Sequence, residues 1–158
     1  MIAAVEYMFN KATAEVISEH LHKCDADFVP LLSGRVEINS YAKKIISKAL
    51  RFEAWSRGIL VGLIAVYCND QEKRIAYITN VSVLKKWTGK GIAASLMSQC
   101  IKDLKAVGIR QICLDVASEN MTAIKLYEKN GFVASKDNVP FVTMSLNLNN
   151  GHEHEKKT

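Results

Sequence analysis

The sequence lacks the features that mark membrane-spanning and secreted proteins. Its longest apolar run, residues 59–67, is far shorter than the roughly 20 residues needed to cross a bilayer. The first ten residues contain Glu6 and no basic segment followed by a long apolar stretch, so a secretory signal is not expected. We therefore expect a soluble, cytoplasmic protein without a membrane partner.

Patterns for metal binding and disulfide bonding are also missing. The four cysteines are widely separated, form no CxxC pair and have no histidine at ligand spacing. Three of them lie in apolar runs, which predicts buried, reduced thiols. His152 and His154, near the C-terminus, do not make a closed coordination shell, so we expect no metal site. The cysteines are Cys24, Cys68, Cys100 and Cys113.

The composition is that of a soluble globular domain. Of the 158 residues, 49% are hydrophobic and 23% are charged, which allows a sizeable core. We expect residues 1–148 to form a single domain and the polar residues 149–158 to be disordered. The net charge is +5, and Lys85, Lys86 and Lys90 crowd one short stretch.

Helical and extended patterns alternate along the chain. Apolar residues recur at helical spacing after the candidate cap Thr13, in residues 38–50 with Asn39 or Ser40 near the start, and in residues 92–104 and 120–130. The irregular segment 27–37 joins the first two helices. Short β-rich runs span residues 5–9, 52–55, 59–67, 75–83, 111–116 and 141–148, and the turns between the second, third and fourth predict an antiparallel meander.

A glycine-rich turn, residues 88–94, lies between the strand 75–83 and the next helix. Glycine permits positive φ, and a helix N-terminus offers free N–H groups and a favourable dipole. The turn therefore predicts a pyrophosphate site, to which Lys85, Lys86 and Lys90 would add positive charge. Taken alone, the segment also fits an ordinary turn with solvated lysines.

Two other phosphate-binding motifs fit this turn less well. Gly89, Gly91 and Ala94 satisfy the GxGxxA form of a dinucleotide-binding fingerprint, and Asp115 lies downstream where a ribose-binding acid would be needed. However, five residues separate the first glycine from the strand, and the preceding strands look like antiparallel hairpins. A Walker-type loop is excluded because no Gly-Lys-Ser/Thr ends the motif.

A second motif follows in residues 120–132, which read Asn-Met-Thr-Ala-Ile-Lys-Leu-Tyr-Glu-Lys-Asn-Gly-Phe. With the strand end 81–83 and the turn 89–93 before it, this order of motifs resembles the GCN5-related N-acetyltransferase (GNAT) family over about residues 59–132. The resemblance implies an α/β (α+β) fold whose central mixed, mostly antiparallel sheet is flanked by about four helices. It also implies direct transfer of an acetyl group from acetyl-coenzyme A to an amine.

The resemblance implies roles for individual residues as well. Tyr127 would hold its hydroxyl near the thioester sulfur and protonate the leaving thiolate, while a backbone N–H near Val81 or Ser82 would stabilise the oxyanion. By spacing alone, Asn120 is a helix cap and Tyr127 a core aromatic. Thr88 departs from the Arg or Gln usual in the family. The implied cofactor-binding residues are Val81, Ser82, Val83, Lys86, Thr88, Gly89, Lys90, Gly91, Ile92, Ala93, Ala94 and Asn120.

The sequence does not single out a general base. Tyr77 and Thr79 would share the strand face toward the thioester, but neither is a good base when unperturbed. We therefore expect the amine to lose its proton through ordered water. The other candidates, each more often a surface group, are His20, His22, Glu37, Glu53, Asn80, Asp115 and Glu119.

The acceptor is also open among a small amine, an amino sugar, an antibiotic and a protein amino group. The segment 28–41 is the expected acceptor wall, and Arg35, Glu37, Tyr77 and Thr79 are the expected substrate contacts. A non-catalytic acyl-CoA-binding or sensing domain is the second hypothesis. A nucleic-acid-binding module ranks last, since no binding motif accompanies the lysines. We expect a monomer or a homodimer.

Overall fold

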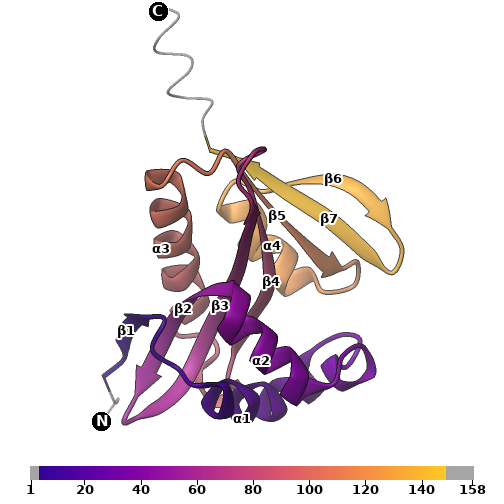
Figure 1. Cartoon of the computed structure of the whole chain (residues 1–158). Coiled ribbons are helices and arrows are strands. Elements are labelled where there is room, and N and C mark those ends of the chain that lie inside the picture. The colour runs from indigo at the N-terminus through magenta and orange to yellow at the C-terminus, as the bar shows by residue number, and fades with distance from the viewer. Residues whose placement is uncertain (1–3, 149–158) are drawn as a thin grey trace, which may run out of the picture.

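Seven strands form one sheet in the computed structural model, which describes residues 4–148 (Figure 1). Only β4 and β5 pair in parallel, and the other neighbouring strands are antiparallel. The predicted meander and the mixed, mostly antiparallel sheet are therefore confirmed. In spatial order the strands are β1 (Glu6–Phe9), β2 (Ala49–Ser56), β3 (Ile59–Asp70), β4 (Ile75–Val83), β5 (Gln111–Ala117), β7 (Phe141–Asn147) and β6 (Val133–Asn138).

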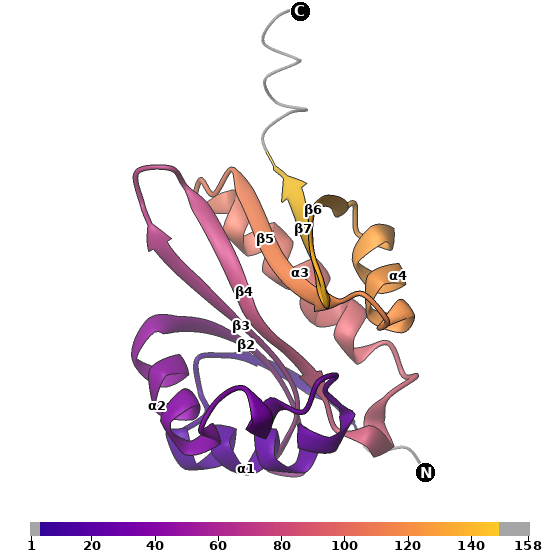
Figure 2. The same ribbon diagram turned by 90° about the vertical axis from the view of Figure 1, so that its right-hand side faces the viewer.

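Four α-helices cover the two faces of the sheet (Figure 2). The apolar stripes of α1 and α2 pack on one face, where Ile17 and Ile45 meet Leu63 of β3. α3 and α4 pack on the other face, over a core that contains Leu96 and Ile112. No helix in the described part of the chain is long and apolar enough to cross a membrane. The helices are α1 (Ala14–Cys24), α2 (Ile38–Lys48), α3 (Ile92–Ala106) and α4 (Met121–Lys129), and short 3₁₀ turns span Asp25–Asp27, Leu32–Gly34 and Lys85–Trp87.

Two elements differ from the sequence prediction. The helical pattern placed Ala49 and Leu50 in α2, but both residues begin β2, where Ala49 pairs with Tyr67. Ala49 is extended (φ −110°, ψ 144°), so sheet pairing overrides the helical periodicity at this point. β6 was missed altogether, because all six of its residues are exposed and no apolar alternation marks it.

The cap of α2 is Glu37 and not Asn39 or Ser40 as predicted. Its carboxylate accepts hydrogen bonds from the amide of Asn39 at 3.1 Å and from the amide of Ser40 at 3.0 Å. The Ser40 hydroxyl and these amides lower the pKa of Glu37, as expected for an anion at a helix N-terminus. Thr13 caps α1, as predicted.

Two of the four cysteines are less buried than predicted. Cys24 and Cys100 are buried, Cys68 and Cys113 are half-buried, and all four thiols are free. The predicted disordered tail, residues 149–158 with His152 and His154, lies outside the described residues.

A β-bulge at Thr79 separates β4 from β5. Pairing with β3 shifts register here, since Ala65 lies opposite Asn80 while Val66 lies opposite Ile78. Parallel pairing between β4 and β5 ends at Ile78, although both strands continue. A bulge bends its strand and increases the local twist, so the C-terminal half of β4 turns away from β5. The sheet is therefore open between residues 79–83 and residues 115–117.

Gly62 of β3 brings the first turn of α3 against the sheet. A Cβ at this position would lie 2.8 Å from Cγ2 of Ile92 and 3.2 Å from Cδ1 of Leu96. Contacts this short would push the helix away, so glycine is needed for the close approach. The approach sets the N-terminus of α3 beside the open half of β4.

A buried carboxylate fixes the entry into α1. Glu53 of β2 is fully buried, and its oxygens accept hydrogen bonds from the amides of Lys11 and Ala12 at 3.0 to 3.2 Å and from Nε1 of Trp55 at 2.9 Å. Nε of Arg51 lies 3.5 Å away. These contacts occupy the Glu53 carboxylate and make it a structural anchor. Glu53 is therefore not the general base, for which the sequence offered several candidates.

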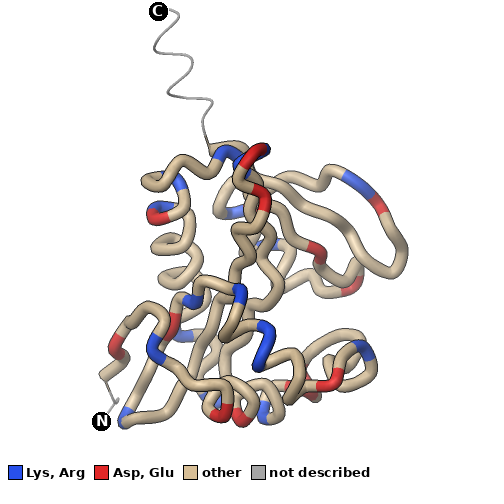
Figure 3. Tube along the Cα trace, in the orientation of Figure 1, with Lys and Arg blue, Asp and Glu red and all other residues tan. Residues whose placement is uncertain are grey.

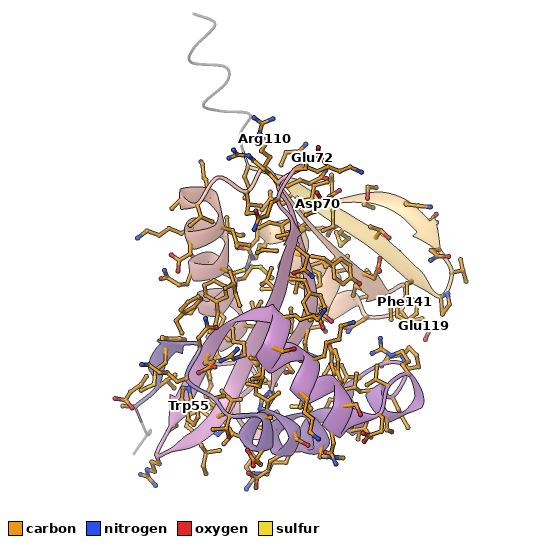
Figure 4. The ribbon with its side chains drawn as sticks, in the orientation of Figure 1. Trp55, Asp70, Glu72, Arg110, Glu119 and Phe141 are labelled. Atoms are coloured by element: carbon orange, nitrogen blue, oxygen red, sulfur yellow. The ribbon has the colours of Figure 1, made fainter. Side chains whose placement is uncertain are left out.

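We expect Glu53→Gln to lower the free energy of unfolding by about 3 kcal/mol, because it leaves Arg51 and one backbone amide without their buried anion. Chemical denaturation monitored by circular dichroism measures the change. Glu72→Gln, at an exposed turn near the opposite end of the sheet (Figure 4), is the matched control and should change stability little. Equal stability of both variants would contradict the anchoring role.

Candidate active site

A cavity of about 570 Å³ lies where β4 and β5 diverge. Its walls come from the segment between α1 and α2, from β4 and β5, from the glycine-rich turn with the first turn of α3, and from α4. The sequence-predicted residues that line it are Arg35, Tyr77, Thr79, Val81, Ser82, Val83, Thr88, Gly89, Gly91, Ile92, Ala93, Ala94, Asn120 and Tyr127.

Three of the predicted site residues lie outside this lining. Glu37 caps α2, and Lys86 and Lys90 are exposed beside the glycine-rich turn. In Figure 3 the basic residues are spread along the described trace and alternate with acidic ones. Both lysines are therefore accessible to a charged group that approaches the turn.

The open edge of β4 presents backbone groups to the cavity. The amide of Leu84 donates to the carbonyl of Val61, so in this antiparallel pair the bonded positions alternate from there along β4. Ser82 is bonded to β3, whereas the N–H and C=O groups of Val81 and Val83 point away from β3. Since β5 has already diverged, these groups are free to bind a ligand that lies along the edge.

The N-terminus of α3 adds a second set of free donors. The first helical hydrogen bond runs from Ser95 to the carbonyl of Gly91, which leaves the amides of residues 92–94 without helical partners. Gly91 is the cap, has φ 81° and supplies no side chain, whereas α1, α2 and α4 have side-chain caps. A Cβ on Gly89 or Gly91 would meet nothing within 4 Å, so the turn is open to an anion.

α4 carries two functional candidates into the same cavity. Asn120 caps the helix through Oδ1, which accepts from the amide of Ala123 at 3.2 Å. Tyr127 is 6% exposed, and its ring packs against Phe132 with centroids 5.9 Å apart. Burial raises the pKa of Tyr127 to about 12, so its hydroxyl is protonated at neutral pH. Asn120 is therefore a helix cap and Tyr127 a core aromatic, as their spacing predicted. Both positions are compatible with a role in the cavity.

A buried polar network lies behind β4. His20 of α1 contacts the Leu60 carbonyl through Nδ1 at 3.0 Å and the Ser82 hydroxyl through Nε2 at 2.9 Å. Ser82 in turn lies 2.7 Å from Oδ1 of Asn80. Burial lowers the pKa of His20 to about 4, so the ring is neutral, and the Leu60 carbonyl favours the tautomer with hydrogen on Nδ1. His20 is thus a weak base, and its hydrogen bonds join α1 to β3 and β4.

The sequence did not single out Asp115, which lines the cavity in the fold. Asp115 of β5 was weighed as a ribose-binding acid and as one of several bases. Its carboxylate accepts hydrogen bonds from the hydroxyl of Tyr77 at 2.9 Å and from that of Thr143 at 2.5 Å. Asp115 lies between Leu114 and Val116, which are both buried. This alternation predicts that Asp115 is on the exposed face of β5, but it does not predict which residues contact it.

Aromatic and cationic groups enclose the same side of the cavity. The Tyr41 hydroxyl donates to the carbonyl of Thr79 at 2.8 Å, which ties α2 to the bulge. Arg35 lies over the ring of Phe141, 5.6 Å from its centroid, and joins the segment before α2 to the start of β7. Figure 4 places Phe141 at the end of β7 that faces this segment. No sequence signal pointed to Phe141, because the contact spans most of the chain.

No metal centre accompanies these residues within 4–148, where no three His, Cys, Asp or Glu side chains gather in a way that could hold an ion.

The chain is similar to known acetyltransferases. The chain matches the model of the acetyltransferase (GNAT) family over residues 20–132. It is 32% identical over 88 residues to N-alpha-acetyltransferase MAK3 of Arabidopsis thaliana, covering 55% of this chain and 46% of that relative. It is 30% identical over 74 residues to the uncharacterized N-acetyltransferase YycN of Bacillus subtilis, covering 46% and 47%. The chain thus spans about half the length of these curated relatives.

The fold is similar to that of a protein whose structure was solved with a ligand bound. The PaiA N-acetyltransferase of Thermoplasma acidophilum, crystallised in complex with coenzyme A, superposes with a TM-score of 0.73 at 19% identity. The superposition covers 91% of this chain and 99% of that one. At this identity the similarity shows a common fold.

We expect the stability to depend on pH through His20. Its pKa is lowered from about 6.5 in the unfolded chain to about 4 in the fold, so the unfolded chain binds more protons between these values. The stabilisation is complete above about pH 6.5 and is lost as the pH falls toward 4, by about 3 kcal/mol in total.

The pH dependence can be measured as the free energy of unfolding at several pH values between 7 and 5. His20→Gln should flatten the slope, since the titrating group is gone, whereas the exposed His22→Gln should keep it. A slope that is the same in wild type and His20→Gln would show that other groups cause it.

Proposed function

Because the chain belongs to the acetyltransferase (GNAT) family, we propose that it transfers the acetyl group of acetyl-coenzyme A directly to a primary amine of a small molecule, an amino sugar or a protein. One observation carries the proposal: the open edge of β4, the free amides of α3 and the Tyr127 hydroxyl line a single cavity. A cytoplasmic location and a monomeric or homodimeric state remain expectations from the sequence.

The pyrophosphate of coenzyme A would bind at the first turn of α3. Residues 92–94 offer three free amides, and the helix dipole favours negative charge there. Thr88 supplies no long polar side chain, and its hydroxyl is already bonded to the carbonyl of Lys85 at 2.7 Å. Backbone donors would therefore carry most of the binding, with Lys86 and Lys90 adding charge at the mouth.

The pantetheine arm would lie along the open half of β4. Amide groups of the arm can pair with the free backbone groups of Val81 and Val83, as an added strand would. Asn120, on the opposite wall, can donate from its free amide nitrogen. The N–H of Val81 then faces the thioester carbonyl, where it would stabilise the oxyanion that forms on attack.

The reaction itself needs one attack and three proton transfers. The amine nitrogen forms a bond to the carbonyl carbon, the carbon–sulfur bond breaks, and the thiolate takes the Tyr127 proton. The nitrogen loses its second proton as the amide forms, and this proton restores the Tyr127 hydroxyl. The acceptor arrives as an ammonium ion and must first lose a proton. Asp115 is one of the two carboxylates that line the cavity and bonds the Tyr77 hydroxyl, and we propose that it holds the ammonium and receives this proton through an ordered water.

We expect Gly91→Glu to weaken coenzyme A binding by about 100-fold, because a carboxylate would occupy the anion site and the residue would have to adopt φ 81°. Calorimetric titration with coenzyme A measures the loss. Gly91→Ala is the matched control, since it adds the backbone strain without the charge and should lose far less. Unchanged affinity in Gly91→Glu would remove the pyrophosphate from this turn.

We expect Tyr127→Phe to lower kcat by about 10- to 1000-fold with little change in coenzyme A affinity, as for a lost general acid. Release of free thiol from acetyl-coenzyme A in the presence of an amine measures kcat. Tyr7→Phe, on the exposed strand β1, is the control. Tight binding of coenzyme A without turnover of any amine would favour the acyl-CoA-binding domain that was the second hypothesis.

A further inference from the structure

We infer that the acceptor is a short zwitterionic amine whose ammonium group binds Asp115 and whose carboxylate binds Arg35. The inference rests on the proposed function, because it names the class of amine that would enter the same cavity. It starts from the charged side chains of the cavity lining, which number three: Asp27, Arg35 and Asp115.

Asp115 is held in one position while staying exposed to the cavity. Its two oxygens accept from the hydroxyls of Tyr77 and Thr143, which come from the strands on either side of β5. Neither donor is charged, so the negative charge of the carboxylate is uncompensated. An oriented carboxylate with free lone pairs is a good partner for an ammonium group.

Arg35, in the segment before α2, lines the same cavity with its donors available. Its guanidinium lies over the ring of Phe141, which holds the planar group in place through cation–π attraction. The ion pairs within residues 4–148 are Lys23–Glu19 and Arg51–Glu53, so Arg35 has no acidic partner in the described chain. A guanidinium fixed in this way matches the bidentate geometry of a carboxylate.

The two opposite charges lie near the same end of the β5–β7 pair: Phe141, under Arg35, pairs with Ala117, two residues after Asp115. Burial and the Asp115 carboxylate raise the pKa of Tyr77, while the positive charge of Arg35 acts in the opposite direction. Both charges therefore act on the same hydroxyl, although they form no ion pair with each other. Both residues line the same cavity, and a ligand with one charge of each sign would satisfy both.

The third charged residue of the lining, Asp27, would favour a different class of acceptor. Asp27 lies just after the end of α1. The pKa of the Cys24 thiol is raised mainly by burial and, to a smaller extent, by the negative charge of Asp27. If Asp27 and Asp115 together set the preference, the acceptor would carry a second positive charge. Arg35 would repel such a diamine from the Tyr77 side, which is why we favour the zwitterion.

The test compares acceptors that differ only in the group at the far end. ω-Amino acids of two to six carbons, their primary amides and the diamines of equal length are assayed with acetyl-coenzyme A. We expect kcat/KM for an amino acid of matching length to exceed that for its amide by about tenfold or more, the effect of one charge-assisted contact. Amidated peptides with Glu or Gln at the second residue show whether a peptide can supply the same pair of charges.

Variants of Arg35 link the preference to this residue. Arg35→Met should remove the preference, so that kcat/KM for the amino acid falls to the value that the same variant shows for the amide. Arg35→Glu should reverse the order and favour the diamine. Arg110→Met, an exposed residue at the other end of the sheet from Phe141 (Figure 4), should keep the wild-type preference.

Calorimetric binding of the amino acid to the coenzyme A complex separates the two proposals. Binding that depends on Arg35, without acetyl transfer, would support the zwitterion site and overturn the proposed function. Acetylation of acids, amides and diamines at equal kcat/KM would overturn the inference and leave the function intact. A wild-type preference for diamines, or a carboxylate preference that survives in Arg35→Met, would also overturn it.

Discussion

The bulge at Thr79 is the constraint on which the site depends. It inserts one residue into β4 opposite the continuous strand β3, and the parallel pairing with β5 stops one residue earlier. β5 stays paired with β7 as far as Ala117 and so moves away with the C-terminal hairpin. Tyr41 bonds the carbonyl of Thr79, which keeps the bulge in one conformation. Without this single insertion the central strands would pair throughout and the cavity would close.

The two faces of the sheet serve the two halves of the proposed reaction. On one face, α3 and α4 surround the proposed donor side with backbone amides, a glycine-rich turn and Tyr127. On the other, α1, α2 and the segment between them build the proposed acceptor wall from side chains. β4 belongs to both, because its backbone edge would face the donor while Tyr77 and Thr79 would face the acceptor. His20 and Asn80 stiffen this shared strand from behind.

The glycine-rich turn and the α4 residues of the cavity were predictable from the sequence because their signals are local. The turn 88–94 and the motif 120–132 each lie within a few residues, so spacing alone identifies a helix start, a cap and an aromatic. Arg35, Tyr77 and Thr79 were also proposed from the sequence and line the cavity, but their contacts were not predictable because they form only in the fold. Arg35 contacts Phe141, and Tyr77 contacts Asp115, across separations of 106 and 38 residues in the chain. Glu37, a polar residue in the same segment as Arg35, lies outside the cavity lining and caps a helix.

The open half of β4 has a further consequence for the protein between turnovers. It is a sheet edge in the interior of the molecule, whereas β1 and β6 are the edges at the outside. Free edges invite pairing with other chains, and this one lies inside a cavity with walls from several elements. A donor that pairs with Val81 and Val83 would complete the sheet as a removable strand. Heat resistance and hydrogen exchange of these two amides would then report how much donor the protein holds.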